Sequence, residues 1–409
     1  MADTSTVPAD VLVQHPSPRA AGCPFDPPPA LRELTGRPLT RVRIWDGSTP
    51  WFVARHDLMR TLLGDPRVSA EPERPGFPHR SAGQKASGLG RRTFINMDDP
   101  DHARLRRMVT GPFAVKRMEA LRPRVQQIVD GLIDEMLAGP NPTDLVQAFA
   151  LPVPSLVICE LLGVPYADHD LFQRSTKVIV RRDSAPQEVA QASATLTDYL
   201  DALLAEKQRR PADDLLSVLA TKQVAAGEMT RREAAQMGVL LLAAGHETTA
   251  NMIALGTLAL LSHPDQLTLL RESEDPKVVA GAVEELLRYL NITHSGRRRV
   301  ALEDIEIDGE VIRAGEGIIF GGEVANRDPA AFPGDPDALD LRRDARRHVA
   351  FGFGVHQCLG QPLARVELQV VYNTLYKRVP TLAAAAGIDE LEFKHDGFVY
   401  GVYELPVTW

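Results

Sequence analysis

The stretch that decides the fold is Phe351-Gly-Phe-Gly-Val-His-Gln-Cys-Leu-Gly360. Glycines before and after Cys358 allow a tight turn with close backbone approach. A helix is predicted to begin near Gln361, with Pro362 in its first turn, so that backbone N–H groups would face the sulfur. Because such surroundings favour thiolate over thiol, Cys358 is predicted to be a metal-binding thiolate. The alternative is a small buried hydrophobic residue.

This run resembles the heme-binding signature of the cytochromes P-450, in which the cysteine thiolate is the axial ligand of heme iron. The resemblance implies a mainly α fold with minor β structure, a triangular prism of helices around a buried heme b. It implies one catalytic domain over 30–409, after a Pro-rich N-terminal arm over 1–29. It also implies that Phe351, Gly352 and Gly360 line the heme pocket.

Hydrophobic periodicity outside this run predicts mostly helix with a few short strands. One hairpin is expected between 42 and 54, and another between 305 and 312. A long irregular excursion is expected from 69 to 95, because the stretch is rich in Pro, Gly and Ser. The predicted helices cover 117–137, 145–162, 168–180, 187–207, 230–262, 276–290 and 361–378.

The predicted 230–262 helix carries Ala244-Gly-His-Glu-Thr-Thr249 within an apolar stretch, where polar residues need a reason. A threonine hydroxyl can bond back to a preceding carbonyl and open a groove in the helix. The run is similar to the family's oxygen-activation motif. The likeness implies that Ala244 leaves room beside the iron, Thr248 hydrogen-bonds dioxygen and Glu247 relays protons. The alternative is that Glu247 and Thr248 are satisfied polar residues.

Several cations are predicted to meet the two heme carboxylates. His102 and Arg106, at i and i+4, share one face of a helix. By resemblance they bind the heme propionates, as do His356 and one arginine of the 297–299 run, with Arg299 preferred. Charge-assisted bonds would explain cations inside an acidic protein. The alternative is that these charges are solvated.

Glu285 and Arg288, at i and i+3, can pair on one helix face. On an exposed surface such a pair contributes little. In the resembled family it is a buried structural lock behind the heme. The arginine that completes the triad in many relatives would fall near Ala338, so the third partner stays open between Arg343 and His348.

A substrate pocket is expected above the heme. Its mainly apolar walls favour a large hydrophobic substrate, such as a polyketide or macrolide, a terpenoid, a steroid or a xenobiotic. The 69–95 loop is expected to be a mobile lid, whose Arg74 and Arg80 either face solvent or contact substrate. The predicted wall residues are Leu240, Ala243, Ile95, Leu290, Ile292 and the C-terminal Phe398, Val399 and Tyr400.

The chain has no Gly-x-Gly-x-x-Gly fingerprint and, at 409 residues, is too short for a fused reductase. Electrons from NAD(P)H are therefore expected through separate proteins, by resemblance a ferredoxin and its reductase. A basic face on the cysteine side would steer the acidic ferredoxin; the alternative is a solvated arginine face. The arginines concerned are Arg104, Arg107, Arg343 and Arg347.

Composition excludes other classes of protein. The net charge of −8 argues against nucleic-acid binding. Residues 1–29 hold seven prolines and no apolar run, so we expect no membrane anchor and a cytoplasmic location. The protein is also expected to be a monomer. Three cysteines are too few for a disulfide framework, so Cys23 and Cys159 are expected to be free thiols.

The predicted function is a heme-thiolate monooxygenase that inserts one oxygen atom from O2 into a hydrophobic small molecule, most simply by C–H hydroxylation. The chain resembles the actinomycete class that acts in secondary metabolism, including antibiotic biosynthesis. Alternatives are a nitric oxide reductase-type or peroxide-driven enzyme and a non-catalytic heme-binding partner protein. Because Cys358, Glu247 and Thr248 are all present, the monooxygenase is favoured.

Overall fold

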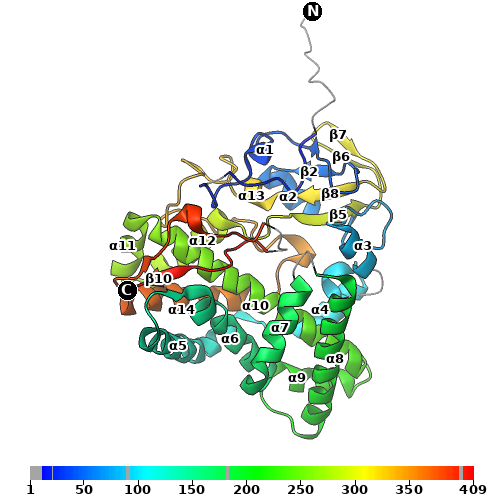
Figure 1. The fold of residues 1–409 in the computed structure, drawn as a ribbon. Coiled ribbons are helices and arrows are strands. Elements are labelled where there is room, and N and C mark those ends of the chain that lie inside the picture. The colour runs from blue at the N-terminus through cyan, green and yellow to red at the C-terminus, as the bar shows by residue number, and fades with distance from the viewer. Residues whose placement is uncertain (1–11, 21, 89–92, 181–183, 396–398) are drawn as a thin grey trace, which may run out of the picture.

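The structure is a computed structural model that describes residues 12–20, 22–88, 93–180, 184–395 and 399–409. Figure 1 shows most of the long helices gathered in one part of the molecule and most of the strands in another. The mainly α fold with a minor β component is confirmed.

The helical part is built on α10 (Arg231–Leu261), the longest helix in the described ranges. It begins with the predicted capping box: Thr230 Oγ1 accepts from Glu233 N at 3.1 Å, and Glu233 Oε2 accepts from Thr230 N at 2.7 Å. Every side chain from 250 to 260 is buried. The predicted path of this helix through the protein interior is confirmed.

Other helices pack against α10, and α12 and α14 begin and end where the sequence predicts. The predicted 145–162 helix is divided into a π-helical turn at Val146–Ala150 and α6. Around α10 lie α6 (Pro152–Leu162), α7 (His169–Val180), α8 (Pro186–Arg209), α11 (Pro264–Glu272), α12 (Pro276–Leu290) and α14 (Gln361–Arg378). Further out are α2 (His56–Leu63), α4 (Asp101–Thr110), α5 (Val115–Ala138) and α9 (Leu215–Val218).

The main sheet has the strand order β1-β2-β8-β5-β3. The predicted first hairpin is present, but its first strand lies before the predicted start at 42, with Thr40 opposite Phe52 and Arg41 opposite Trp51. β6 (Ile305–Ile307) and β7 (Glu310–Ile312) form the predicted second hairpin. The strands of the main sheet are β1 (Thr40–Arg41), β2 (Trp51–Val53), β3 (Val68–Ser69), β5 (Arg297–Ala301) and β8 (Gly317–Phe320). A small C-terminal sheet joins β4 (Thr143–Asp144), β9 (Ala383–Ala384) and β10 (Pro406–Thr408).

The 69–95 stretch is less irregular than expected. It contains α3 (Ala82–Gly88) and the start of a 3-10 turn at Phe94–Asn96. Its beginning is held by Asp98, which accepts from Ser69 Oγ and, at 2.8 Å, from Ala70 N. The prediction of an irregular excursion is therefore wrong for α3. Residues 89–92 lie outside the described ranges.

The described part of the N-terminal arm packs against the rest of the molecule and leads into α1 (Pro29–Arg32). His15 N donates to Arg43 O at 2.8 Å, and the His15 ring is buried. The Arg19 guanidinium is also buried and lies 4.1 Å from the centre of the Tyr400 ring. The first contact joins the arm to the region of the first hairpin, and the second joins it to the C-terminal segment.

Neither a membrane span nor a disulfide is found among the described residues. No helix there combines the length and the apolar character that crossing a bilayer requires. Cys23, Cys159 and Cys358 are free, which confirms the prediction for the first two.

Candidate active site

The segment 350–360, called the cysteine loop below, turns tightly immediately before α14. Gly352 and Gly354 have φ of 75° and 73°, which glycine adopts without strain. A Cβ at Gly354 would lie 2.4 Å from Leu63 O, so any side chain there would collide with α2. Cys358 N donates to Phe351 O at 2.8 Å and closes the loop. The predicted turn with close backbone approach is confirmed.

The thiol of Cys358 has accessible surface, although protein encloses it closely enough to affect its ionisation. Burial raises the pKa of Cys358, while the N–H groups of Gly360 and Gln361 and the guanidinium groups of Arg297 and Arg106 act in the opposite direction. Without a bound metal, burial has a larger effect on the pKa of Cys358 than these N–H and guanidinium groups have. The turn by itself therefore does not favour thiolate, which corrects our expectation; a metal cation at the sulfur would be needed.

Cations converge near the cysteine loop as predicted. His102 of α4 lies against His356, with 4.2 Å between ring centroids, and His102 Nδ1 is 2.9 Å from Asp99 Oδ1. Arg106, one turn further along α4, donates to Gln357 O at 2.6 Å. Burial, followed by the charges of Arg299, His102 and Arg106, lowers the pKa of His356 to about 3. Positive charge is thus concentrated in the interior.

Three polar atoms in this cluster have no hydrogen-bond partner among the described residues. They are the buried His102 Nε2, His356 Nδ1 and Arg297 Nη1. Burial, with the nearby Arg297, also lowers the pKa of Arg299 to about 10. Buried guanidinium groups such as those of Arg297 and Arg299, the first with a free N–H group, require an anion. The residues therefore fit a group that carries two carboxylates beside a cysteine-bound metal, as heme does.

The arginine run on β5 contributes more than the sequence predicted. Alternation along the strand places Arg297 and Arg299 on one face and Arg298 on the other. Arg298 donates to Pro78 O at 2.8 Å and to His79 O at 3.0 Å, away from the site. Arg297 donates to Ala350 O in the cysteine loop. The position of Arg297 on the same strand face as Arg299 could have been predicted from the two-residue period of a β-strand.

The middle of α10 carries the predicted polar pair. Thr248 Oγ1 donates to Ala244 O at 2.7 Å, which confirms the back-bond. α10 continues through this region without interruption. Ala244 is exposed although α10 is otherwise largely buried. The free surface beside Ala244 agrees with the room that the sequence predicted there.

Glu247 has partners that the sequence did not suggest. Its Oε1 accepts from Lys394 Nζ at 3.2 Å and from Asn251 Nδ2 at 3.1 Å. Burial raises the pKa of Glu247, but Lys394, His246 and Asn251 more than offset this, and the net direction is downward. Glu247 is therefore held as a carboxylate. No local pattern points to Lys394, which is 147 residues away in the sequence.

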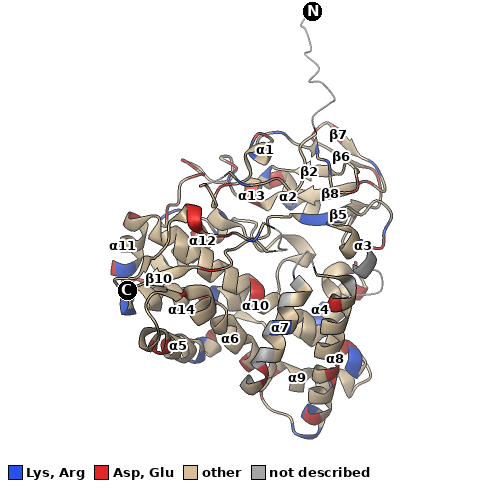
Figure 2. Cartoon of the chain, in the orientation of Figure 1, with Lys and Arg blue, Asp and Glu red and all other residues tan. Residues whose placement is uncertain are grey.

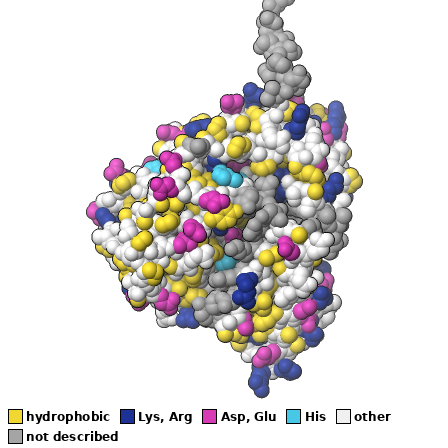
Figure 3. Space-filling model, viewed as in Figure 1, with side chains coloured by type: hydrophobic (Ala, Val, Ile, Leu, Met, Phe, Trp, Pro, Cys, Tyr) yellow, Lys and Arg dark blue, Asp and Glu magenta, His cyan; other side chains and the backbone are white. Residues whose placement is uncertain are grey.

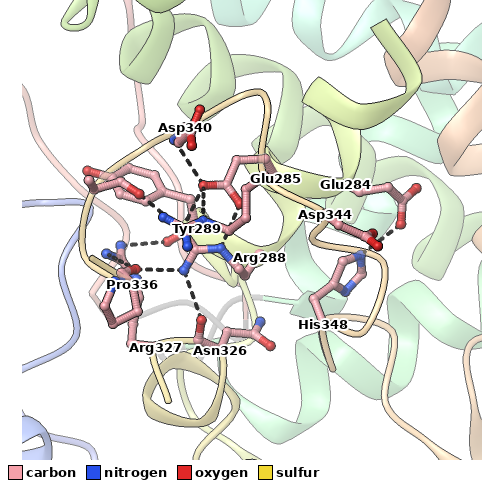
Figure 4. Close-up of polar contacts among 12 residues, drawn as sticks. Glu284, Glu285, Arg288, Tyr289, Asn326, Arg327, Pro336, Asp340, Asp344 and His348 are labelled. Carbon is pink, nitrogen blue, oxygen red and sulfur yellow. Dashed lines mark hydrogen bonds and ion pairs between the residues drawn. The ribbon is translucent and has the colours of Figure 1, made fainter. Parts of the chain in front are cut away.

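The Glu285–Arg288 pair is a closed network in Figure 4. Both side chains are fully buried, and Arg288 donates to both carboxylate oxygens at 2.7 Å. Glu285 Oε1 also accepts from Asp340 N at 3.0 Å and Arg343 Nε at 3.3 Å. Arg343 is therefore the third side chain. The remaining Arg288 donors bond to the carbonyls of Asn326, Pro336 and Ala338.

His348, the other candidate for that third position, belongs to a neighbouring cluster. Its Nε2 lies 3.1 Å from Glu284 Oε2, and Arg365 Nε donates to Glu284 Oε1 at 2.6 Å (Figure 4 shows the His348 contact). Although burial would raise it, these two partners hold the pKa of Glu284 at about 2. Glu284 and Glu285 thus organise separate networks from adjacent positions of α12.

The predicted pocket walls divide into two groups. Ile95 is 52% exposed, and Leu240, Ala243 and Ile292 are half-buried, so these four have surface to offer a ligand. Leu290 and Val399 expose only 2% and 4%, so the structure packs both inside, against our prediction, and Tyr400 is buried beneath Arg19. Phe398 lies outside the described residues.

The two arginines of the expected lid have partners in the chain. Arg74 pairs with Glu71 at 2.9 Å, and Arg80 Nη2 donates to Gly296 O at 3.4 Å. Neither arrangement requires a substrate. The structure therefore gives no support to substrate contacts by these residues.

The proposed basic face is reduced from four arginines to three. Arg104, Arg107 and Arg347 are exposed, but the Arg343 side chain is only 10% exposed and serves Glu285. Arg104 Nη1 donates to Glu228 O at 3.1 Å. Figures 2 and 3 show basic and acidic residues interspersed over the side in view, without a face of one charge there.

Comparison with known proteins identifies close relatives. Residues 166–378 match the family model described as Cytochrome P450. Cytochrome P450 GfsF of Streptomyces halstedii is 56% identical over 415 residues, all of both chains. Its crystal structure has a TM-score of 0.92 and covers 97% of this chain and 100% of that chain.

Two other relatives have printed activities. Vitamin D3 dihydroxylase of Streptomyces griseolus is 47% identical over 412 residues, again all of both chains. The crystal structure of mycinamicin VIII C21 methyl hydroxylase MycCI from Micromonospora griseorubida is 40% identical, has a TM-score of 0.89 and covers 97% of this chain and 100% of that chain. Similar folds in this group thus act on different compounds.

Proposed function

Because this chain belongs to the cytochrome P450 family, we propose that it is a heme-thiolate monooxygenase that hydroxylates a C–H bond of a hydrophobic small molecule. One observation carries the proposal: interior cations with unpartnered donors surround a loop that presents an accessible cysteine. A non-catalytic partner protein would not need both Glu247 and Thr248 on α10.

Cys358 would ligate the iron of heme b, and His102, Arg106, Arg299 and His356 would bind the propionates. We add Arg297, whose Nη1 is free and whose charge acts on Cys358. When bound, heme supplies the reductive activation of dioxygen that monooxygenation requires.

The protein's own part is to supply protons and to orient the substrate. Thr248 presents its hydroxyl beside the small Ala244, and Glu247 precedes it on the same helix. A carboxylate at this place can accept a proton from solvent and pass it on. Ile95, Leu240, Ala243 and Ile292 offer apolar surface to the substrate.

The substrate class we propose is a large apolar secondary metabolite, with macrolides first. The mycinamicin hydroxylase supports this choice by its structure and its name, and the vitamin D3 dihydroxylase keeps steroid-like compounds as the second choice. Electrons would come from NAD(P)H through a ferredoxin reductase and a ferredoxin. The protein would act as a monomer in the cytoplasm, and its exposed Arg107 and Arg347 would contact the ferredoxin.

The test combines spectroscopy with turnover. Wild-type protein that is reduced and exposed to carbon monoxide should show the heme-thiolate Soret band. Cys358→Ser should lose that band, and Cys23→Ser, a free exposed cysteine, should keep it. A macrolide and steroid panel should then contain a compound that shifts the heme spin state and is hydroxylated with ferredoxin. A missing thiolate band in the wild type would overturn the proposal.

The catalytic pair is tested separately with Thr248→Ala. Loss of the hydroxyl should divert reducing equivalents to hydrogen peroxide while substrate binding stays within about twofold of wild type. The ratio of product to NAD(P)H consumed measures this. Unchanged coupling would contradict the role of Thr248.

Rapid NADH oxidation with nitric oxide and without ferredoxin would replace the proposal by nitric oxide reduction. Equal turnover with peroxide alone would replace it by a peroxide-driven reaction.

A further inference from the structure

Glu247 is bound in a nearly buried ion pair. The Lys394 and Glu247 side chains are 14% and 13% exposed, and 3.2 Å separates Nζ from Oε1. Asn251, one turn further along α10, donates to the same oxygen at 3.1 Å and to Glu247 O at 2.7 Å. Charge pairs shielded from water are held more firmly than surface pairs. The carboxylate therefore has a defined resting position.

The segment that carries Lys394 is fixed against α10. Lys394 N donates to Gly401 O at 2.8 Å, and Phe393 forms a β-bridge with Val402. A Cβ at Gly401 would lie 1.7 Å from Asn251 Oδ1, so the backbone at Gly401 presses directly on that amide. This C-terminal segment leads to β10 and is coloured red in Figure 1. Its position sets where the lysine meets the helix.

The charged environment of Glu247 is simple. Among the described residues, the groups that act on it are Lys394 from the C-terminal segment, and His246 and Asn251 from α10 itself. Burial lowers the pKa of His246, whereas Glu247 acts on it in the opposite direction. Lys394 supplies the ammonium group that contacts the Glu247 carboxylate.

We propose that Lys394 is a positioning residue that holds Glu247 ionised against the C-terminal segment, so that proton delivery requires this ion pair to open. The inference rests on the proposed function, in which Glu247 carries protons. On opening, the carboxylate leaves the ammonium, accepts one proton from water and donates it toward the Thr248 side of α10. The transferred proton comes from solvent water.

The first experiment measures the protonation of Glu247 in the purified holoprotein. Its carboxyl stretch is followed by infrared difference spectroscopy across pH and is assigned with Glu247→Gln. Lys394→Met removes the charge and should make Glu247 at least tenfold easier to protonate, because burial is then unopposed. Lys394→Arg keeps the charge and should restore the wild-type titration. Lys377→Met, which removes an exposed lysine paired with Glu274 at 3.5 Å, is the matched control.

The second experiment measures the solvent isotope effect on turnover and the yield of hydrogen peroxide. Lys394→Met should change both by twofold or more, while the heme spectrum and thermal unfolding stay close to those of Lys394→Arg. Titration of Glu247 in Lys394→Met that matches Lys377→Met would overturn the inference. Failure of the proposed function is seen separately as a missing thiolate spectrum, because the infrared titration does not depend on turnover.

Discussion

Two clusters of buried arginines in this molecule differ in whether their donors are satisfied. Around Glu285, Arg288 donates to both carboxylate oxygens and to three backbone carbonyls. Around Cys358, Arg297 Nη1, His102 Nε2 and His356 Nδ1 are buried and find no hydrogen-bond partner in the part of the chain that the structure describes. The first cluster is complete within the chain and holds the fold together. The second is incomplete without an added anion, which distinguishes a binding site from a structural network.

The largest effect is expected from breaking the complete cluster. Arg288→Met would leave Glu285 charged and buried, with only Arg343 to oppose it, and should lower the free energy of unfolding by about 3–5 kcal/mol. Chemical denaturation measures this. Arg346→Met removes an exposed arginine paired with Asp344 and should cost under about 1 kcal/mol. Equal losses in the two variants would contradict the structural role.

The next effect concerns the incomplete cluster. Arg299→Gln should increase the rate of heme loss by roughly tenfold, because one charge-assisted bond to a carboxylate is removed. Transfer of heme to excess apomyoglobin gives this rate. Arg298→Gln is the matched control on the opposite face of β5: it loses bonds to Pro78 and His79 and should lower stability without faster heme loss. Similar rates for both would show that the strand face does not matter.

A third prediction tests the network of Glu284, which is also complete within the chain. Because His348 and Arg365 hold the pKa of Glu284 at about 2, below its ordinary 4.5, folding favours the carboxylate. This contribution to stability is full above pH 4.5 and is lost as the pH falls toward 2. Glu284→Gln should flatten that part of the profile when denaturation is measured from pH 3 to 6. A parallel decline in variant and wild type would refute the assignment.

The smallest effect is expected at the surface. Arg107→Gln should slow ferredoxin association by a few-fold at low salt and leave the unfolding free energy unchanged. Stopped-flow reduction at two ionic strengths measures this. Arg232→Gln, an exposed arginine that pairs with Asp198 at 3.2 Å, serves as the control. If both variants respond alike to salt, Arg107 has no special part in docking.

The sequence predicted features that depend on local spacing. Thr248 bonds back four residues to Ala244, Glu285 pairs three residues on with Arg288, and α14 follows the cysteine loop directly. Each rests on helix periodicity or on glycine geometry, both of which can be seen within a short window of sequence.

Features that depend on distant contacts were missed or misplaced. The Lys394–Glu247 and His348–Glu284 pairs join residues 147 and 64 positions apart. Leu290 was expected at the pocket, but α12 ends there with its face turned into the core. Arg343 was predicted both as a possible third partner of Glu285 and as part of the basic face, and only the first prediction agrees with its contact with Glu285. Only tertiary packing decides which of several similar side chains meets a given partner.

The contact between the cysteine loop and α2 has a consequence for the order of assembly. Gly354 lies against Leu63 O, and His56 Nε2 bonds to Arg347 O across 291 residues. The cations of the site come from α4, β5 and the cysteine loop, which are equally scattered along the chain. Contacts of such long range form late in folding. The cofactor is therefore expected to be captured by a full-length chain after synthesis, and not by a growing one on the ribosome.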